Sequence, residues 1–473
     1  MAWQFPQSAT LNDTVVSLDE EEESVFVSRE VYIAVQDGAA ATIYASANKH
    51  QIVVAGTVAN ASNSAISIGT DSAVSHGSVV TVEQTGQVRG FGDVGAFRIN
   101  AYDTTVVNHG LIASDGFAMV FNGQAATGES SLVNTGIIDG TKVGISHGGS
   151  GPTTETLTVL NSGTISGGVE AYDSLSSVIA KDEITNNGKM IGDIYLGGAN
   201  DLYDGRLGTV QGDVFGDVGK DRLYAGAGND RLFGQNDNDT LMGGAGADYL
   251  SGGSGSDRAS YASASKAVIV SLANPAINSG DAKGDTFSSI EHLTGSNFND
   301  ALNGNSGNNA INGAAGNDII KGYAGNDTLT GYSGADIFVF NTALNASTNV
   351  DTITDYSFSA DTIQLDDSIF TALATGVLAS GAFRSNTTGL AQDADDRIIY
   401  ENDTGELYYD ANGNGSGAGV LFAKVGIGLG LTNADFVVIL PPGRAGRSRT
   451  PPSRRSPFPQ LVVGRDLRVR QWP

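Results

Sequence analysis

The chain has 473 residues, and its 52 Asp plus Glu against 26 Lys plus Arg give a formal net charge of −26. This acidity argues against a nucleic-acid partner, because phosphate contacts need Lys and Arg, and it favours cations. The chain has no Cys, which excludes disulfides, thiolate zinc sites and cysteine catalysis.

The first segment, residues 1–40, is expected to be an N-terminal cap or a leader-like segment. Its start, Met1-Ala2-Trp3-Gln4-Phe5-Pro6, lacks a basic stretch followed by an apolar run, so no Sec-type signal peptide is expected. No stretch of the chain reaches the ~20 apolar residues that a membrane-spanning helix needs. Export, if it happens, must use another signal.

A long repeat follows, of the form Gly-x-(Val/Ile/Met)-x-Gly, between Gly56 and Gly192. Asn precedes several copies, as in Val107-Asn108-His109-Gly110. A short strand, an Asn-containing turn and another strand would make one coil of a parallel β-helix, with alternating apolar residues pointing inward and Asn stacked in ladders. We therefore predict a parallel β-helix-like domain over 41–212. A β-sandwich of regular hairpins is the alternative.

A sharper repeat of nine residues occupies two blocks, residues 213–260 and 295–340, separated by an insertion at 261–294. Each unit centres on an Asp, with an apolar residue two positions after it and glycines two and five positions before it in most units. The first six residues can form a turn in which glycines let carbonyl oxygens converge, and the last three a minimal strand. Two units per coil predict a flattened parallel β-roll in which turns eighteen residues apart are stacked.

Stacked turns of this kind predict calcium as the cofactor. A hard cation between two turns would meet carbonyl oxygens and two carboxylates, and six to eight oxygens at ~2.3–2.6 Å are calcium coordination. The core of one Leu per unit is thin, so metal binding should be coupled to folding. The predicted metal-binding residues are Asp221, Asp230, Asp239, Asp248, Asp257, Asp300, Asp318, Asp327, Asp336, Gly219, Gly228, Gly243, Gly244, Gly246, Gly252, Gly253, Gly255, Gly316, Gly325 and Gly334.

Five carboxylate pairs follow from the stacking. They are Asp221 with Asp239, Asp239 with Asp257, Asp230 with Asp248, Asp300 with Asp318, and Asp318 with Asp336. Asn309 replaces an Asp, so its pairing with Asp327 should be weak.

Gly-Gly-Ala-Gly-Ala-Asp at 243–248 and Gly-Gly-Ser-Gly-Ser-Asp at 252–257 resemble the RTX, or haemolysin-type, calcium-binding nonapeptide. The resemblance covers about 213–440. It implies a secreted, extracellular protein whose partners are calcium ions and the type I secretion machinery. It also implies that 341–440 form a C-terminal capping and secretion-signal domain. The Arg- and Pro-rich tail at 441–473 departs from this pattern, and it is either a genuine extension or the product of a reading-frame shift.

The sequence offers little evidence for an enzyme. It contains no His-Glu-x-x-His, and Gly144-Ile145-Ser146-His147-Gly148 fits Gly-x-Ser-x-Gly without the helical pattern that a nucleophile elbow needs, so Ser146 is interpreted as a turn residue. We therefore expect an all-β, non-enzymatic protein whose β-helix contacts a cell-surface glycan or matrix. The alternative is a carbohydrate-active enzyme, lyase- or epimerase-like, with an acid–base pair at Asp115 or Asp139.

Overall fold

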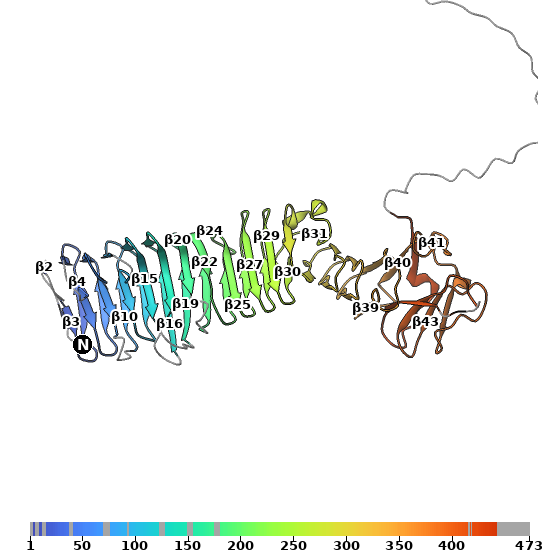
Figure 1. The fold of residues 1–473 in the computed structure, drawn as a ribbon, viewed down its shortest axis with the longest axis horizontal. Helices are drawn as coiled ribbons and strands as arrows, with labels where there is room; N and C mark the ends of the chain where they lie inside the picture. The colour runs from blue at the N-terminus through green and yellow to red at the C-terminus, as the bar shows by residue number, and fades with distance from the viewer. Residues whose placement is uncertain are drawn as a thin grey trace, which may run out of the picture.

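The computed structural model describes residues 3–4, 9–11, 16–36, 41–69, 76–91, 94–122, 128–148, 155–174, 180–414, 417 and 419–441. The predicted basic tail lies, from residue 442 onward, outside the described residues. Figure 1 shows a long stack of flat coils, then a narrower stack, then a rounded C-terminal unit. The described part is almost entirely strands, which confirms the all-β class. None of its helices is long and apolar enough to cross a membrane.

One sheet runs the length of the molecule and contains twenty strands. In spatial order they are β1 (Trp3–Gln4), β4 (Ser24–Val27), β7 (Gln51–Val54), β10 (Val79–Val82), β13 (Thr105–Asn108), β16 (Gly128–Asn134), β19 (Glu155–Asn161), β21 (Asp182–Asn186), β23 (Leu202–Asp204), β26 (Arg222–Tyr224), β28 (Thr240–Met242), β30 (Arg258–Ser260), β33 (His292–Thr294), β35 (Ala310–Asn312), β37 (Thr328–Thr330), β39 (Asp351–Ile353), β45 (Val420–Lys424), β44 (Glu406–Tyr409), β43 (Ile398–Glu401) and β42 (Phe383–Asn386).

A second sheet of nineteen strands covers the opposite side of the first coils. One row is β2 (Ala9–Leu11), β5 (Tyr32–Val35), β8 (Thr57–Asn60), β11 (Gln87–Gly90), β14 (Leu111–Ser114), β17 (Ile137–Gly140), β20 (Thr164–Ser174), β22 (Lys189–Tyr195) and β24 (Thr209–Gln211). The other row is β3 (Val16–Leu18), β6 (Ile43–Ala45), β9 (Ile66–Ile68), β12 (Phe97–Ile99), β15 (Phe117–Asn122) and β18 (Val143–Gly148). The two rows share the long strands β20 and β22 and then separate, because the first half of β22 pairs with β24 and the second half pairs with β25 (Val214–Val218). The second row continues through β27 (Arg231–Asn236), β29 (Tyr249–Ser254) and β32 (Thr286–Ser288).

A third sheet replaces the second one within the insertion. It contains β31 (Ile269–Ser271), β34 (Ala301–Asn303), β36 (Ile319–Lys321), β38 (Ile337–Phe340), β40 (Thr362–Asp366), β46 (Phe436–Ile439) and β41 (Gly376–Val377). Four single-turn 3-10 helices lie among the described residues, namely η1 (Pro275–Ile277), η2 (Gly280–Ala282), η3 (Ser380–Ala382) and η4 (Asn433–Asp435). Strand β31 of the insertion pairs in parallel with β34 of the second repeat block, so the roll resumes after the insertion.

The coils of the N-terminal half are parallel, which excludes the β-sandwich of hairpins. Thr105 of β13 pairs with Val79 of β10 and with Ser131 of β16 in the same direction. Each coil up to β18 has three strands rather than the two that were predicted. The third strand escaped prediction because the glycine repeat marks only the first turn of each coil. Parallel pairing already joins β4 to β7, so the solenoid includes residues before 41.

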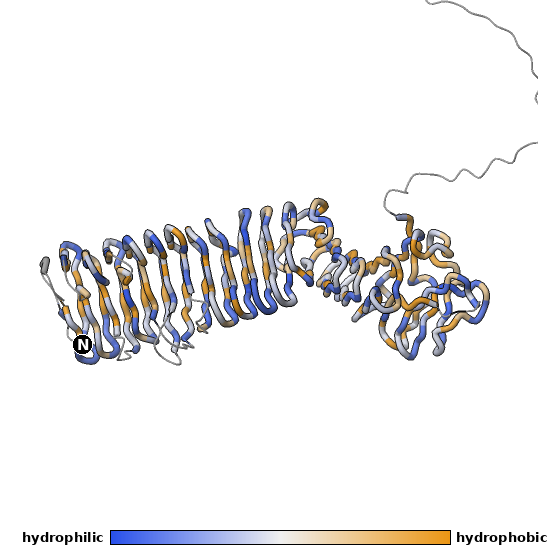
Figure 2. The backbone as a smooth tube through the Cα atoms, viewed as in Figure 1, coloured by the Kyte–Doolittle hydropathy of each residue, from blue (hydrophilic) through white to orange (hydrophobic). Residues whose placement is uncertain are grey.

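The repeat blocks have two strands per coil, as the nine-residue period predicted. Arg222 of β26 pairs with Thr240 of β28, and Thr240 pairs with Arg258 of β30, eighteen residues along at each step. Figure 2 shows hydrophobic stretches along the strands and hydrophilic ones at many of the turns. The core of a block is a single row of buried apolar residues per side. On the first sheet that row includes Leu223, Leu241, Ala259, Leu293, Ile311 and Leu329.

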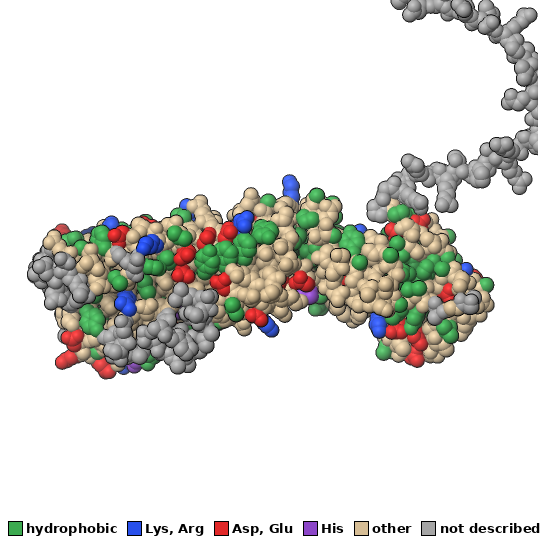
Figure 3. Space-filling view, viewed as in Figure 1, with side chains coloured by type: hydrophobic (Ala, Val, Ile, Leu, Met, Phe, Trp, Pro, Cys, Tyr) green, Lys and Arg blue, Asp and Glu red, His purple; other side chains and the backbone are tan. Residues whose placement is uncertain are grey.

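Two ladders continue from coil to coil. Inside the β-helix, the buried amides of Asn108, Asn134, Asn161 and Asn186 donate each to the next at 2.8 Å. On the outer face, four partly exposed aromatic rings follow one another from β22 to β29, with centroid separations of 4.5, 4.8 and 5.6 Å. They are Tyr195, Phe215, Phe233 and Tyr249. Figure 3 shows hydrophobic and acidic side chains together over this part of the molecule.

Candidate calcium-binding site

The turns of the repeat require glycine at two positions. In the unit at 243–251, Gly244 and Gly246 have φ of +93° and +157°, and the strand β29 begins directly after Asp248. A Cβ on Gly246 would lie 1.5 Å from the carbonyl oxygen of Gly228 on the preceding coil. Glycine therefore lets stacked turns approach closely enough to bring backbone oxygens together.

Every glycine predicted for the site lies in such a turn. Positive φ occurs at Gly219, Gly228, Gly244, Gly246, Gly253, Gly255, Gly316, Gly325 and Gly334. The first glycine of a unit has another role, because it faces the unit's own carboxylate. A Cβ on Gly243 would lie 2.2 Å from Oδ2 of Asp248, and one on Gly252 would lie 2.4 Å from Oδ2 of Asp257.

The Asp side chains form columns along the edges of the roll. In the first block, Oδ1 of Asp239 accepts the backbone N–H of Asp221 at 2.8 Å, and Oδ1 of Asp257 accepts that of Asp239 at 2.8 Å. On the other edge, Oδ1 of Asp248 accepts the N–H of Asp230 at 2.9 Å. Each Asp therefore anchors the turn of the preceding coil through one oxygen.

The second block repeats this arrangement. Oδ1 of Asp318 accepts the N–H of Asp300, and Oδ1 of Asp336 accepts that of Asp318, both at 2.8 Å. All five predicted pairs are thus neighbours on stacked turns.

The other carboxylate oxygen, Oδ2, is buried and has no hydrogen-bond partner in seven of the predicted residues. They are Asp221, Asp239, Asp248, Asp257, Asp318, Asp327 and Asp336. Burial raises the pKa of Asp239, Asp248 and Asp318 to about 7. A desolvated carboxylate without a cationic partner is costly, and a hard cation is the ligand that such oxygens accept. The residues therefore fit calcium.

Side chains alone do not complete the coordination. Among the residues that the structure describes, no three His, Asp or Glu side chains converge as a metal site. The further oxygens must come from turn carbonyls, such as those of Gly228 and Gly316, which face the glycines Gly246 and Gly334 of the next coil. A site of carboxylates plus backbone oxygens selects calcium over zinc.

Two units of the second block differ from the rest. Asp300 already has partners for both oxygens, since Ser296 donates its N–H to Oδ2 at 2.5 Å and Val268 donates its N–H to Oδ1 at 2.7 Å. Asn309 donates its N–H to Oδ1 of Asp327 at 2.7 Å like an Asp unit, but its amide donates to the carbonyl of Glu291 at 3.0 Å. Both side chains are satisfied by the protein itself.

Acidic residues outside the nine-residue period extend the columns, and the sequence analysis missed them. Oδ1 of Asp285, Asp351 and Asp361 accepts the N–H of Asp248, Asp327 and Asp336 at 2.9, 3.1 and 2.9 Å. Each of the three precedes a strand by one residue or starts it, in the pattern Asp-Thr-apolar. Their spacings of 37, 24 and 25 residues hide them from a periodicity search.

The Gly-x-Ser-x-Gly motif lies inside strand β18 and not in a turn. Ser146 is part of the parallel ladder with Val120 and Asp173. His147 is buried, and its Nδ1 lies 2.7 Å from Oδ1 of Asp182. A residue within a continuous strand cannot form a nucleophile elbow.

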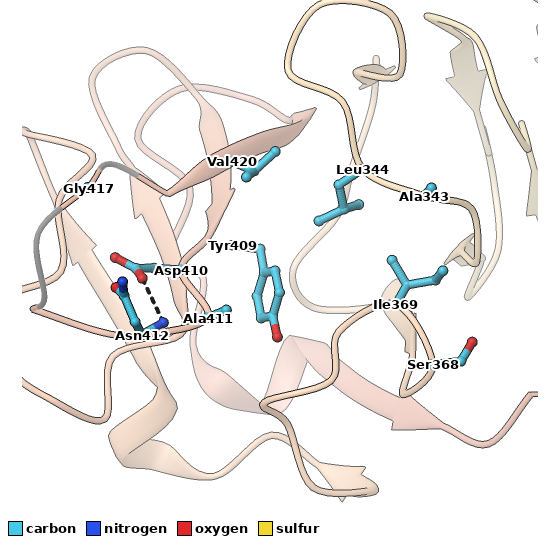
Figure 4. Close-up of a pocket in the computed structure, with 10 residues that line it drawn as sticks. All are labelled: Ala343, Leu344, Ser368, Ile369, Tyr409, Asp410, Ala411, Asn412, Gly417 and Val420. Carbon is cyan, nitrogen blue, oxygen red and sulfur yellow. Dashed lines mark hydrogen bonds between the residues drawn. The ribbon is translucent and has the colours of Figure 1, made fainter.

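A cavity of about 520 Å³ in the C-terminal unit (Figure 4) lies between the loop carrying Leu344 and the strand carrying Tyr409. Its polar groups are engaged, because the Tyr409 hydroxyl accepts the N–H of Ala372 at 2.8 Å and Asp410 accepts the N–H of Asn412 at 3.0 Å. Its wall combines apolar side chains with those of Ser368, Asp410 and Asn412.

Comparison with known families agrees with this geometry. The model of the RTX calcium-binding nonapeptide repeat matches four overlapping copies, at residues 215–250, 224–259, 285–320 and 313–341. The chain carries RTX-type calcium-binding repeats. Its RTX repeats bind calcium, and their β-roll carries the Asp columns. A search of curated proteins finds no match to the chain.

Proposed function

We propose that this RTX protein is secreted and that calcium outside the cell folds its β-roll, which carries the β-helix as an interaction domain. The observation that carries the proposal is the row of buried Oδ2 atoms without partners on stacked turns. In the unfolded chain water hydrates these oxygens, and folding removes that water. A bound cation compensates for the lost hydration, so the folded roll is most stable when a cation is present.

The proposed ligands are the Asp carboxylates of the columns and the turn carbonyls that face them. In the first block these are Asp221, Asp239 and Asp257 on one edge and Asp230 and Asp248 on the other. In the second block, Asp318, Asp327 and Asp336 supply oxygens without partners, while Asp300 contributes less because Ser296 occupies it. Bound calcium supplies the positive charge that lets these carboxylates stay ionised when buried.

Secretion follows from the same coupling. A roll that needs calcium stays unfolded where calcium is scarce, as in the cytosol, and an unfolded chain can pass through a type I channel. The absence of Cys and the net charge of −26 agree with a chain that relies on metal for its stability. Expression beside a type I exporter should place the chain in the medium. Retention in cells with a working exporter would contradict this part.

Circular dichroism of the full chain during a calcium titration tests the folding proposal, with magnesium as the control. We expect a cooperative gain of β signal with calcium alone. A chain whose spectrum and thermal stability ignore calcium would overturn the proposal.

A glycine-floored groove on the β-helix supports the interaction role. The groove has a volume of about 660 Å³, and its floor includes Gly110, Gly136 and Gly163. A Cβ at Gly136 would lie 2.2 Å from the carbonyl oxygen of Gly110. Polar side chains border it, including His109, whose Nδ1 lies 2.7 Å from Oγ1 of Thr135. Exposed amide, hydroxyl and imidazole groups over a backbone floor suit the hydroxyls of a glycan.

Retention of the calcium-loaded protein on immobilised polysaccharides tests this role. Ile137 lines the groove and is 48% exposed, so Ile137→Arg should block binding without disturbing the core. Val169→Arg is the matched control, because Val169 is 61% exposed and lies outside the groove. Equal retention of both variants would contradict the groove. Shortened chains or unsaturated products in the same assay would support the carbohydrate-active enzyme instead.

A further inference from the structure

Residues 196–201 form a turn that lies one coil before the residues matched by the RTX family model. Gly197 and Ala199 have φ of +86° and +133°. The corresponding glycines of the unit at 243–251, Gly244 and Gly246, have +93° and +157°. An alanine rarely adopts such a φ, so the stacking of the turn holds it there.

Hydrogen bonds join this turn to the next coil as they join the RTX turns. Ala199 donates its N–H to the carbonyl of Val218 at 2.9 Å, and Lys220 donates its N–H to Oδ1 of Asn200 at 2.8 Å. The same two bonds occur inside the matched repeats, from Gly228 to Ala245 at 2.9 Å and from Ala247 to Asn229 at 3.0 Å. The turn at 196–201 is therefore an RTX turn in its backbone geometry.

The oxygens of a cation site are also present. Oδ1 of Asp221 accepts the N–H of Asp201 at 2.8 Å. Both carboxylates are 1% exposed, and the Oδ2 of each is buried without a partner. The carbonyl oxygen of Ala199 faces Gly219, where a Cβ would lie 1.3 Å from it.

We propose that the stacked turns at 196–201 and 216–221 hold a further calcium ion, bound by Asp201, Asp221 and the Ala199 carbonyl. This inference rests on the proposed calcium sites of the roll. Leu196 and Ala199 stand where most RTX units have glycine. At the position of Leu196 in the unit 243–251, a Cβ on Gly243 would lie 2.2 Å from Oδ2 of Asp248, so Leu196 leaves its unit's carboxylate less freedom than a glycine does. This site therefore fills last in a calcium titration.

The carboxylate one coil before Asp201, that of Asp182, has a different environment. Oδ1 of Asp201 accepts the N–H of Asp182 at 2.7 Å. The Oδ2 of Asp182 is buried without a hydrogen bond, as in the roll, but His147 Nδ1 lies 2.7 Å from its Oδ1, so a side chain that can carry positive charge faces this carboxylate. The array of calcium sites thus starts at Asp201. An ion there joins the last coil of the β-helix to the first coil of the roll.

Native mass spectrometry of the full calcium-loaded chain tests the site by counting bound ions. Asp201→Asn keeps the hydrogen-bonding oxygen and removes the charge, and it should bind one calcium fewer than the unaltered chain. Asp204→Asn is the matched control, since Asp204 lies three residues on and pairs with Arg206 at 2.6 Å outside the turn. An unchanged count for Asp201→Asn would overturn the proposal.

A second variant acts in the opposite direction and keeps every ligand. Ala199→Gly relieves the positive φ, and it should lower several-fold the calcium concentration at which amides 197–204 become protected from hydrogen exchange. An unchanged concentration would overturn the proposal. An unaltered chain that binds no calcium at all would instead overturn the proposed function of the whole roll.

Discussion

The β-helix and the β-roll use the same position of the coil in two ways. In several coils, a polar residue at or near the start of a strand of the long sheet accepts the backbone N–H of its counterpart on the preceding coil. In the β-helix that acceptor is a hydroxyl, as where Ser78 accepts from His50 at 3.3 Å and Ser130 accepts from Thr104 at 3.2 Å. At Asp201 and at the Asp units of the roll that follow it is a carboxylate, whereas Asn309 has an amide at this position. A hydroxyl is satisfied by its protein partners, whereas a buried carboxylate has a second oxygen and a charge that need a cation.

The hydrophobic cores of the β-helix and the β-roll also differ. One β-helix coil buries side chains from three strands, for example Val106, Ile112 and Met119. Coil for coil, the described residues among 79–104 of the β-helix bury seven apolar side chains, whereas residues 240–257 of the roll bury three, Leu241, Met242 and Leu250. Apolar burial contributes ~25 cal/mol per Å², so the β-helix coil offsets more of the entropy of ordering its residues than the roll coil does. Metal dependence is therefore expected in one half only.

Removal of calcium should reveal the largest difference in stability between the β-helix and the β-roll. With a chelator, we expect amides of the strands within 215–340 to lose protection from hydrogen exchange by about 100-fold or more, the factor corresponding to an ion present at 100 times its Kd. Amides of β7 to β19 should keep theirs. Mass spectrometry of peptides from the full chain measures both, and equal loss in the two halves would contradict the comparison.

Removal of one rung of the Asn ladder should damage the β-helix without regard to calcium. Asn134→Ala leaves Asn108 without its acceptor and Asn161 without its donor, which should cost about 3 kcal/mol of unfolding free energy. Val169→Ala, at an exposed position, should change it by no more than about 0.5 kcal/mol. Urea titrations with calcium and with chelator should give the same loss, and a loss seen only with calcium would show that the halves are not independent.

The buried pair at the junction should make stability depend on pH. Burial lowers the pKa of His147, but Asp182 and Glu155 raise it, and the net shift is upward. The stabilisation is thus present below the unfolded pKa of about 6.5 and is lost as the pH rises through the folded value. His147→Asn should cost about 2 kcal/mol near pH 6 and less at pH 9, relative to the unaltered chain at each pH. A gap that does not change with pH would indicate a neutral histidine.

A single carboxylate of the roll should have the smallest effect of the four. Asp239→Asn keeps the oxygen that accepts the Asp221 N–H but removes the charge. Loss of groups that only orient metal ligands weakens affinity 10–100-fold, so this ligand should contribute at least about tenfold. Calorimetric titration with calcium measures it. Asn309→Asp is the reciprocal change, and unchanged binding by both variants would show that the columns are structural only.

The strict nine-residue period determined which carboxylates would be neighbours. Two units per coil allow only one register that buries every Leu, so Asp221 must stack on Asp239 and Asp318 on Asp336. The choice of calcium follows from the same pattern, because carboxylates and glycine carbonyls are oxygen ligands. Asn before the glycines likewise predicted a ladder, and Asn108 to Asn186 form one.

Tertiary structure alone decided what lies outside a constant period. The third strand of each β-helix coil, the partners Asp285 and Glu291 in the insertion, and the turn at Asp201 all depend on connections of unequal length. A connection of 20 or 37 residues places an Asp in the column as well as one of 18 does, because hydrogen bonding across the sheet sets the register. The sequence determined the chemistry of each turn, and the stacking of coils decided which turns meet.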